Sequence, residues 1–337
     1  MKSIRIPEPN RVELVDLPIP VPGAGEVLLR VRASGICGTD IHILRGEYMG
    51  AYPVIPGHEL SGDVAAVGPG VTRVQTGERA ALEPNIACER CEECLNNREN
   101  FCRNRQAVGV TRPGGMSEYV LAPQQAVFPV GDLAYEQAAF VEPLSCVLHG
   151  LERLEPRPGD SVLLAGAGPI GMLLLRGLGL WGAARVDVAE RSPARLAFAG
   201  AEGAGALFPA LEQAPRDGYD CVIDATGSPA VMARLLDHAR PGGKVLWFGV
   251  PPNGAKMELE PFQVFRKGLS IFGSFTSRRN SYQAVELLRG GRIRVADLVS
   301  HRLPLAEFER GCTLIETGQE KVMKVIMRDE GAVNREQ

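Results

Sequence analysis

The sequence lacks both a strong net charge and a long hydrophobic run. Its 37 lysines and arginines against 40 acidic residues leave a formal net charge of -3, so the chain has no basic field of the kind that nucleic-acid-binding proteins carry. The longest apolar stretch, residues 170–181, contains Arg176 and is too short to cross a bilayer. We therefore expect neither a nucleic-acid partner nor insertion into a membrane.

The beginning of the chain also lacks the apolar core of a signal peptide. Residues 1–4 pass directly into a strand-like pattern, which predicts a cytoplasmic location where thiols stay reduced and can bind metals. The sequence contains no internal repeat and no low-complexity segment. With 337 residues, 45% of them apolar and 23% charged, the composition is that of a globular protein of about two domains.

Half of the 8 cysteines lie between residues 88 and 102. Cys88, Cys91, Cys94 and Cys102 have the spacing C-x2-C-x2-C-x7-C, and four soft thiolates so close together suit one tetrahedral Zn2+. A disulfide cluster is more typical of a small secreted chain, and the x7 spacing without a following Cys-Pro disfavours an iron–sulfur cluster. Four protein ligands would leave no position for substrate, so this lobe is predicted to be structural.

The pattern of the chain changes near residue 140. Before it, short alternating strands such as 27–33, separated by glycine and proline turns, indicate a β-rich part. Residues 138–150 have helix-like composition, in which Pro143 predicts a kink or a boundary. From Asp160 onward strands alternate with helices, which predicts an α/β fold with a parallel sheet. The strands are expected at 161–165, 185–189, 220–224, 244–248 and 269–272, with a helix from 281 and a last strand at 321–327.

A glycine turn follows the first of these strands. Gly166-x-Gly168-x-x-Gly171 precedes a predicted helix, and Glu190 closes the next strand, which together make a dinucleotide-binding fingerprint. The glycines allow the pyrophosphate to approach the helix N-terminus, and the carboxylate of Glu190 would accept hydrogen bonds from the ribose hydroxyls. The fingerprint favours NAD, although Arg191 could accept the 2'-phosphate of NADP.

A second metal site is suggested by residues that are distant in the sequence. Cys37, His58 and Glu59 lie on turns beside predicted strands, and Glu142 is a carboxylate in an otherwise apolar stretch. Each has an ordinary structural interpretation when it is taken alone. Together, a cysteine, a histidine and a carboxylate can form a three-ligand zinc site with an open position. Asp40 would then accept the ring N–H of His58 and fix its tautomer.

Five motifs together resemble the zinc-dependent medium-chain dehydrogenase/reductase family, in the family's order and over essentially the whole chain. They are Gly35-Ile-Cys37-Gly-Thr39-Asp40-Ile-His42, Gly57-His58-Glu59-x-x-Gly62, the four-cysteine lobe, Val141-Glu142-Pro143-Leu144 and the glycine turn. Glu142 makes the chain most similar to the polyol and threonine dehydrogenase branch, which includes sorbitol dehydrogenase. The resemblance implies a GroES-like catalytic domain from residues 1–145 and 281–337 and a Rossmann domain from residues 146–280.

The resemblance also implies the chemistry and its residues. Two zinc ions per chain are expected, a structural one on the four cysteines and a catalytic one on Cys37, His58 and Glu142, with Glu59 a direct or exchanging ligand. Thr39 and His42 would carry the alcohol proton to solvent. Cofactor contacts are expected from Gly166, Gly168, Pro169, Ile170, Gly171, Glu190, Arg191, Arg195, Thr226, Val250, Phe275 and Lys324.

The implied activity is hydride transfer from a secondary alcohol, a polyol or a sugar acid, to NAD. The alternatives are an L-threonine 3-dehydrogenase, a butanediol or other secondary-alcohol dehydrogenase, and a non-catalytic nucleotide-binding protein on the same fold. A homo-oligomer, tetramer or dimer, is expected. Candidates for substrate recognition are Arg278 and Arg279, which could bind a carboxylate or phosphate, and Tyr48 and Arg45, which could bind hydroxyls.

Overall fold

The computed structural model describes residues 1–328, which form two compact units. Unit 1 consists of Met1–Ser145 together with the chain from Ser277 onward, and unit 2 of Cys146–Thr276. The sequence predicted the return to the first domain at residue 281, whereas the contacts of the chain place it at Ser277.

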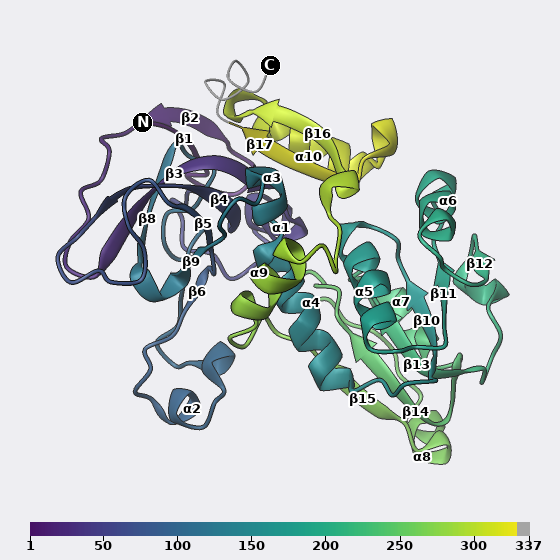
Figure 1. The fold of residues 1–337 in the computed structure, drawn as a ribbon. Helices are drawn as coiled ribbons and strands as arrows, with labels where there is room; N and C mark the ends of the chain where they lie inside the picture. The colour runs from purple at the N-terminus through teal and green to yellow at the C-terminus, as the bar shows by residue number, and fades with distance from the viewer. Residues whose placement is uncertain (329–337) are drawn as a thin grey trace. The chain divides into compact units, whose positions relative to one another are not determined.

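Unit 1 is built around a seven-stranded sheet (Figure 1). The strand order is β16-β17-β3-β4-β5-β9, and β8 pairs with the other half of β3. The apolar side of β3 is buried, in keeping with the alternation of its sequence. The strands are β3 (Glu26–Gly35), β4 (Glu59–Val67), β5 (Arg79–Leu82), β8 (Tyr119–Pro123), β9 (Val127–Pro129), β16 (Val299–Pro304) and β17 (Lys324–Arg328). Two small ribbons add β1 (Lys2–Arg5) with β2 (Glu13–Asp16), and β6 (Asn85–Ile86) with β7 (Gln106–Ala107).

The helices of unit 1 lie at the ends of these strands and in the connections between them. They are α1 (Gly38–Arg45), α2 (Glu92–Leu95), α3 (Tyr135–Ala138), α9 (Ser281–Arg289) and α10 (Phe308–Thr317). The four-cysteine lobe, residues 88–102 around α2, extends from β6 as an excursion from the sheet (Figure 1). The last strand begins later than predicted, because residues Gln319–Lys321 form a short 3-10 turn.

Helix α4 (Val141–Leu154) begins in unit 1 and continues into unit 2. The sequence predicted a kink or a boundary at Pro143, and the boundary is confirmed, because the helix begins two residues earlier and Pro143 lies in its first turn. There the missing N–H of proline has no partner to lose.

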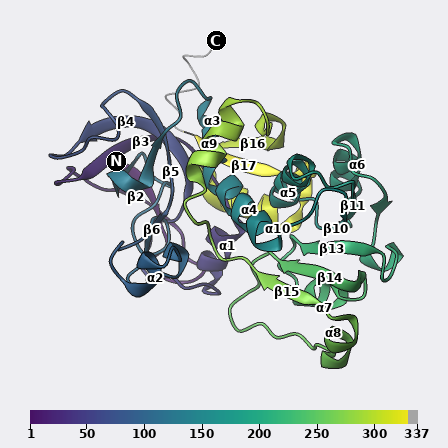
Figure 2. The same cartoon turned by 60° about the horizontal axis from the view of Figure 1, so that its bottom comes forward.

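Unit 2 is a six-stranded parallel sheet with helices on both faces (Figure 2). The order is β12-β11-β10-β13-β14-β15, and every pair is parallel. In Figure 2, α5 and α6 cover one face and α7 and α8 the other, as a doubly wound sheet requires. The strands are β10 (Ser161–Ala165), β11 (Arg185–Ala189), β12 (Leu207–Phe208), β13 (Tyr219–Asp224), β14 (Ala239–Trp247) and β15 (Ser270–Gly273); the helices are α5 (Pro169–Leu180), α6 (Pro193–Ala201), α7 (Pro229–Leu235) and α8 (Pro261–Lys267).

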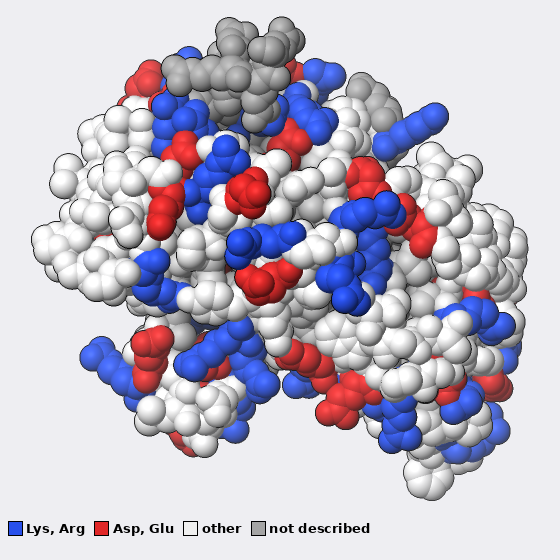
Figure 3. All heavy atoms as spheres, in the orientation of Figure 1, with Lys and Arg blue, Asp and Glu red and all other residues white. Residues whose placement is uncertain are grey.

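The surface has mixed charge on the face that Figure 3 shows, where basic and acidic side chains are interspersed. Many of them form ion pairs, such as Arg302 with Glu136 at 2.7 Å. Among residues 1–328, no helix is long and apolar enough to cross a membrane.

Candidate metal centres and cofactor site

The four cysteines of the lobe converge on one point. Their sulfur atoms all lie within 4.8 Å of one another, with 3.5 Å between Cys91 and Cys94 and 3.9 Å between Cys91 and Cys102. Thiolates around a tetrahedral Zn2+ would stand about 3.8 Å apart, whereas a disulfide requires about 2 Å. The distances fit the metal and exclude the disulfide alternative for these cysteines, which are all free.

The surroundings lower the pKa of one cysteine of the lobe, Cys88, and raise that of another, Cys94. Backbone N–H groups of Arg90 and Cys91 lower the pKa of the Cys88 thiol to about 6, while burial and the neighbouring thiols raise the pKa of Cys94 to about 12. A bound cation is what would hold Cys94 as a thiolate at neutral pH.

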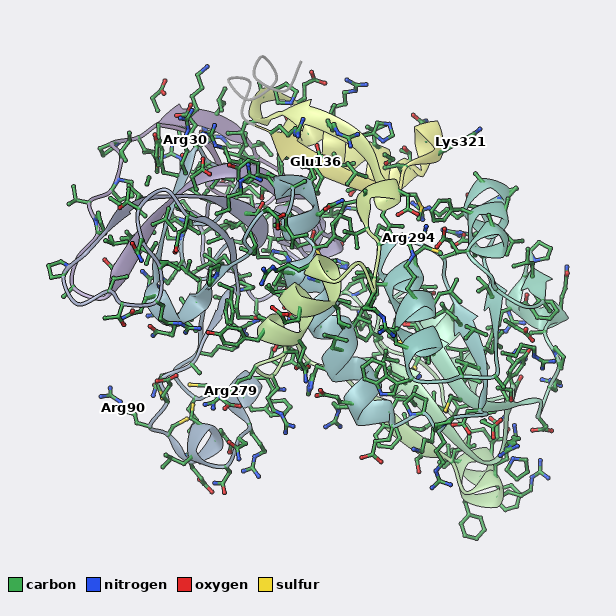
Figure 4. The ribbon with its side chains drawn as sticks, viewed as in Figure 1. Arg30, Arg90, Glu136, Arg279, Arg294 and Lys321 are labelled. Atoms are coloured by element: carbon green, nitrogen blue, oxygen red, sulfur yellow. The ribbon has the colours of Figure 1, made fainter. Side chains whose placement is uncertain are left out.

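Arg278 and Arg279 bind this lobe, although the sequence suggested them for substrate. Nε of Arg279 lies 2.5 Å from the carboxylate of Glu99, whose side chain is 10% exposed. The guanidinium of Arg278 donates to the carbonyl of Asn97 at 3.3 Å. Figure 4 shows Arg279 beside the lobe, whereas Arg90 points away from it. The charge pair therefore fastens the lobe to the segment before α9.

The second group of metal-ligating atoms lies where β3 ends and β4 begins, with His58 and Glu59 buried and Cys37 half-buried. Sγ of Cys37, a ring nitrogen of His58 and a carboxylate oxygen of Glu59 lie within 4.8 Å of one another. We call these three residues the buried cluster. The pairing of Gly35 with Glu59 brings the end of β3 beside the start of β4, so Cys37 and His58 meet although 20 positions separate them.

Asp40 holds the two loops that carry these ligands. Its carboxylate accepts from the backbone N–H of Cys37 at 2.8 Å and of Gly57 at 3.0 Å. It lies 3.6 Å from Nδ1 of His58, which is too long for the direct hydrogen bond that the sequence predicted. Burial alone would lower the pKa of His58, but the charges of Asp40 and Cys37 more than offset it and the pKa is raised well above 6.5.

Lys324 is the charged partner of the buried cluster. It is 5% exposed, its Nζ forms an ion pair with Glu59 and donates to the carbonyl of Ile36 at 3.3 Å. The charge of Glu59 raises the pKa of Lys324 against the opposing effect of burial. Gly35 makes room for the pair, because a Cβ there would lie 2.3 Å from the Glu59 carboxylate.

The sequence suggested Lys324 as a cofactor contact and missed this pairing. The one signal for it was that a buried Glu59 needs a positive partner. The contacts of Lys324 in the structure are those of the buried cluster.

Glu142 and Tyr48 lie beside the buried cluster. Glu142, in the first turn of α4, is 8% exposed. Its carboxylate does not join the tight group of three ligand atoms among the described residues, but its charge raises the pKa of both Tyr48 and Lys324. Burial is the largest cause of the raised pKa of Tyr48, which also feels His58 and Cys37.

Of the other residues predicted for this site, Thr39, His42 and Tyr48 stay candidates, whereas Arg45 is held by an ion pair elsewhere. Thr39 and His42 lie half-buried on α1, and Nδ1 of His42 is 2.9 Å from the carboxylate of Glu47. Arg45, by contrast, forms an ion pair with Glu316 at 2.7 Å. Arg45 is thus engaged with α10, while Tyr48 stays a candidate for substrate recognition.

The donor set of the buried cluster fits zinc. It offers sulfur, nitrogen and oxygen atoms, which are zinc's usual ligands in sites that keep an open position. Nδ1 of His58 is buried and makes no hydrogen bond within the described part of the chain, and the surrounding charges of Asp40 and Lys324 are fixed by the sheet and α1. Cys37, His58 and a carboxylate, from Glu59 or Glu142, would hold the ion.

The glycine turn of unit 2 has the geometry of a dinucleotide site. Gly168 is the N-cap of α5 and Gly166 has a φ of 99°. A Cβ at Gly171 would lie 2.0 Å from the carbonyl oxygen of Gly166. Only glycine permits this turn, and Pro169 and Ile170 begin the helix whose free N–H groups favour an anion.

Glu190 follows β11, as the fingerprint predicted, and its carboxylate is already engaged. It accepts from the backbone N–H of Ala167 and of Ser192, each at 2.8 Å. The guanidinium of Arg195 lies near Gly168, since a Cβ added there would be 3.8 Å from it. Arg191 is exposed.

The carboxyl ends of the neighbouring strands carry the remaining predicted cofactor residues. Thr226 follows β13, Val250 follows β14 and Phe275 follows β15. The buried carboxylate of Asp224, whose pKa is raised by burial, accepts from the backbone and hydroxyl of Thr226 at 3.0 and 2.6 Å. Ligands of doubly wound sheets bind at this edge.

Two family models match the chain. The alcohol dehydrogenase GroES-like domain matches residues 23–132, and the zinc-binding dehydrogenase domain matches residues 169–289. Among curated relatives, D-altritol 5-dehydrogenase of Agrobacterium fabrum (strain C58) is 38% identical over 91% of this chain and 94% of its own length. D-arabinitol dehydrogenase 1 of Uromyces fabae is 33% identical over 92% of each chain.

Solved structures of dehydrogenases also match nearly the whole chain. A zinc-binding dehydrogenase from Sinorhizobium meliloti 1021, bound to NADP, superposes with a TM-score of 0.92 at 33% identity, over 97% of this chain and 99% of the other. An alcohol dehydrogenase from E. coli CFT073, complexed with NADH, superposes with a TM-score of 0.90 at 31% identity, over 98% and 99%. With both domain models matched and such relatives over nearly its whole length, the chain belongs to the zinc-dependent medium-chain dehydrogenase/reductase family, as its motifs predicted.

Proposed function

We propose that the protein oxidises a secondary alcohol of a polyol or sugar acid, with NAD as the hydride acceptor. The observation that carries the proposal is the buried cluster of Cys37, His58 and Glu59, a set of three different donor atoms beside the phenol of Tyr48. The metal-ligating residues belong to unit 1 and the glycine turn to unit 2, so each unit supplies one half of the reaction.

The residues of unit 1 prepare the alcohol. Zinc, when bound, supplies a Lewis acid that lowers the pKa of a coordinated hydroxyl toward neutrality. Asp40 fixes the loops that carry Cys37 and His58, and Lys324 compensates the charge of Glu59. The alcohol proton would leave through Thr39 and His42, whose ring is oriented by Glu47.

The residues of unit 2 bind the cofactor. The free N–H groups at the start of α5 would face the pyrophosphate. The carboxylate of Glu190 favours the ribose hydroxyls of NAD over a 2'-phosphate, while Arg191 and Arg195 act in the opposite sense. One structural neighbour binds NADP and another NADH, so the ratio of kcat/KM for the two cofactors tests the choice. A ratio in favour of NADP would refute it.

The proposed substrate class is supported by two relatives, which are named D-altritol 5-dehydrogenase and D-arabinitol dehydrogenase 1. The test is an NAD-linked assay of the zinc-loaded protein with a panel of polyols, sugar acids, L-threonine and butanediol. We expect turnover of one or more polyols or sugar acids. Turnover of threonine alone or of butanediol alone would assign the corresponding alternative, and NAD binding without any turnover would indicate the non-catalytic alternative.

The location and assembly complete the proposal. We infer a cytoplasmic enzyme that acts on a small alcohol and assembles as a homo-tetramer or homo-dimer. Light scattering on the purified protein tests the assembly, and a monomer at micromolar concentration would refute it.

A further inference from the structure

The carboxylate of Glu83 has an unusual number of partners for a residue outside any predicted motif. It lies between β5 and β6 and is half-buried. One oxygen accepts from the hydroxyls of Ser277 and Ser281, each at 2.8 Å. The other accepts from the backbone N–H and the side-chain amide of Asn85, at 3.1 and 2.8 Å. All of these partners are donors, which suits an ionised carboxylate.

The serines that Glu83 binds mark the places where the chain passes between the units. Ser277 is the first residue of the returning chain and Ser281 begins α9. Ser145 is the last residue before the chain enters unit 2, and its hydroxyl lies 3.4 Å from the same oxygen. The serines are 5% exposed or less, so their hydroxyls depend on partners inside the protein, which for Ser277 and Ser281 is Glu83.

The point where the chain first passes from unit 1 to unit 2, after Ser145, is the first crossing, and it is linked to Glu142. The single hydroxyl proton of Ser145 goes to the backbone carbonyl of Glu142 at 2.7 Å, which leaves its approach to Glu83 as a longer contact. Ser145 and Glu142 share the beginning of α4. Glu83 therefore packs against the helical turn that presents Glu142.

Asn85, which binds the other oxygen of Glu83, extends the hydrogen-bond network to Arg105. Its side-chain oxygen accepts from the guanidinium of Arg105 at 2.7 Å, and the charge of Arg105 is felt by Tyr48. The hydrogen bonds of Glu83 thus reach Ser277, 194 residues further along the chain, and through Asn85 also Arg105, whose charge acts on Tyr48.

We propose that Glu83 is a positioning residue that holds both crossing segments against unit 1 and keeps in place the first turn of α4, which presents Glu142. Its effect on catalysis rests on the proposed function, whereas its effect on the two segments does not. Small displacements of groups around a reacting centre can cost about 100-fold in rate, so loss of Glu83 should lower kcat more than it raises KM for NAD.

The test compares Glu83→Gln with wild type. A glutamine keeps the size of the side chain, but its NH2 cannot accept from donors, so either the serines or Asn85 lose their partner. The control is Glu136→Gln, because Glu136, labelled in Figure 4, forms ion pairs with Arg302 and Arg328 in the same unit and binds neither crossing. Both variants remove one negative charge from a half-buried side chain.

Hydrogen exchange followed by mass spectrometry is the first readout, since it requires no substrate. We expect peptides covering residues 141–150 and 274–284 to exchange about 10-fold faster in Glu83→Gln and at the wild-type rate in Glu136→Gln. Zinc content should stay the same in both. Unchanged exchange at the two segments, or an equal increase in the control, would overturn the proposal.

Kinetics are the second readout. With whichever alcohol the wild-type protein oxidises, we expect Glu83→Gln to lose about 10-fold in kcat with KM for NAD changed by less than about twofold. A changed KM with unchanged kcat would refute positioning.

If Glu83→Gln does not fold, the double variant Ser277→Ala with Ser281→Ala replaces it and should speed hydrogen exchange at residues 274–284 but not at 141–150. If no alcohol is oxidised by wild type, the proposed function fails while the exchange experiment still decides the role of Glu83.

Discussion

The two metal centres of unit 1 are built in opposite ways. The four-cysteine lobe takes all its ligands from residues 88–102, in a loop held by a single turn of helix. The buried cluster takes Cys37 from just after β3 and His58 from just before β4, and its counter-charge Lys324 comes from β17, near the end of the described chain. One centre is local in sequence and the other is assembled by the sheet.

The difference extends to how each centre manages charge. In the lobe, backbone N–H groups stabilise the thiolate of Cys88 and part of the loop faces solvent. In the buried cluster, ionic side chains face one another with almost no exposure: Glu59 is 1% exposed and Lys324 5%. Buried charges depend strongly on their partners, so single substitutions should affect the buried cluster more.

The largest effect is expected from Cys37→Ser. A hydroxyl is a poor zinc ligand at neutral pH, so this variant should lose one of two zinc ions and activity by more than about 1,000-fold, given the Lewis-acid role of the metal. The far-ultraviolet circular dichroism should be unchanged. Metal analysis and steady-state kinetics provide the measurement, and retention of both zinc ions would show that Cys37 is not a ligand.

The next effect concerns stability and comes from Lys324→Met. The methionine leaves Glu59 without its partner inside the protein, which costs about 3–5 kcal/mol when a buried pair is broken. Urea unfolding of the zinc-loaded protein should show this loss, and Lys324→Arg should recover most of it because the charge returns. A loss below about 1 kcal/mol would mean that Glu59 finds another partner, with zinc itself as the alternative.

The comparison also explains what the sequence could predict. The lobe and the glycine turn were found because their function depends on spacing within a short segment, and distances of 3.5 and 3.9 Å between sulfurs were needed only to exclude a disulfide. The buried cluster was proposed from residue types but gained its weight from family resemblance. Its ligands meet only because β3 pairs with β4.

Long-range pairing accounts for what was missed. The ion pair of Lys324 with Glu59 and the contacts of Glu83 with the returning chain link residues that no local pattern relates. The ion pair of Arg279 with Glu99 in the lobe was not predicted for the same reason. Pro143 was predicted to mark a kink or a boundary, and the start of α4 two residues before it confirms the boundary, although composition did not give the first residue of the helix.

A smaller effect on activity is expected from Cys94→Ser in the lobe. The variant should lose the other zinc ion and unfold at a lower temperature, since a structural zinc contributes directly to folding. Activity measured well below the unfolding temperature should stay within about tenfold of wild type, because no substrate position exists at a site with four protein ligands. A loss as large as that of Cys37→Ser would contradict the division between the two centres.

The smallest effect should come from Arg279→Gln, which tests whether the lobe depends on anything outside itself. The side chain of Arg279 is 65% exposed, so its ion pair with Glu99 contributes at most about 1 kcal/mol. Removing it should loosen the lobe and speed the release of its zinc to a chelator by a few-fold, up to about fivefold for 1 kcal/mol.

The matched control is Arg90→Gln. It also removes one positive charge close to the zinc ligands, but the side chain of Arg90 points away from the lobe. Equal release from both variants would show that net charge, and not the contact with Glu99, governs the lobe. Faster release from Arg279→Gln alone would show that even the centre with local ligands is completed by a distant part of the chain.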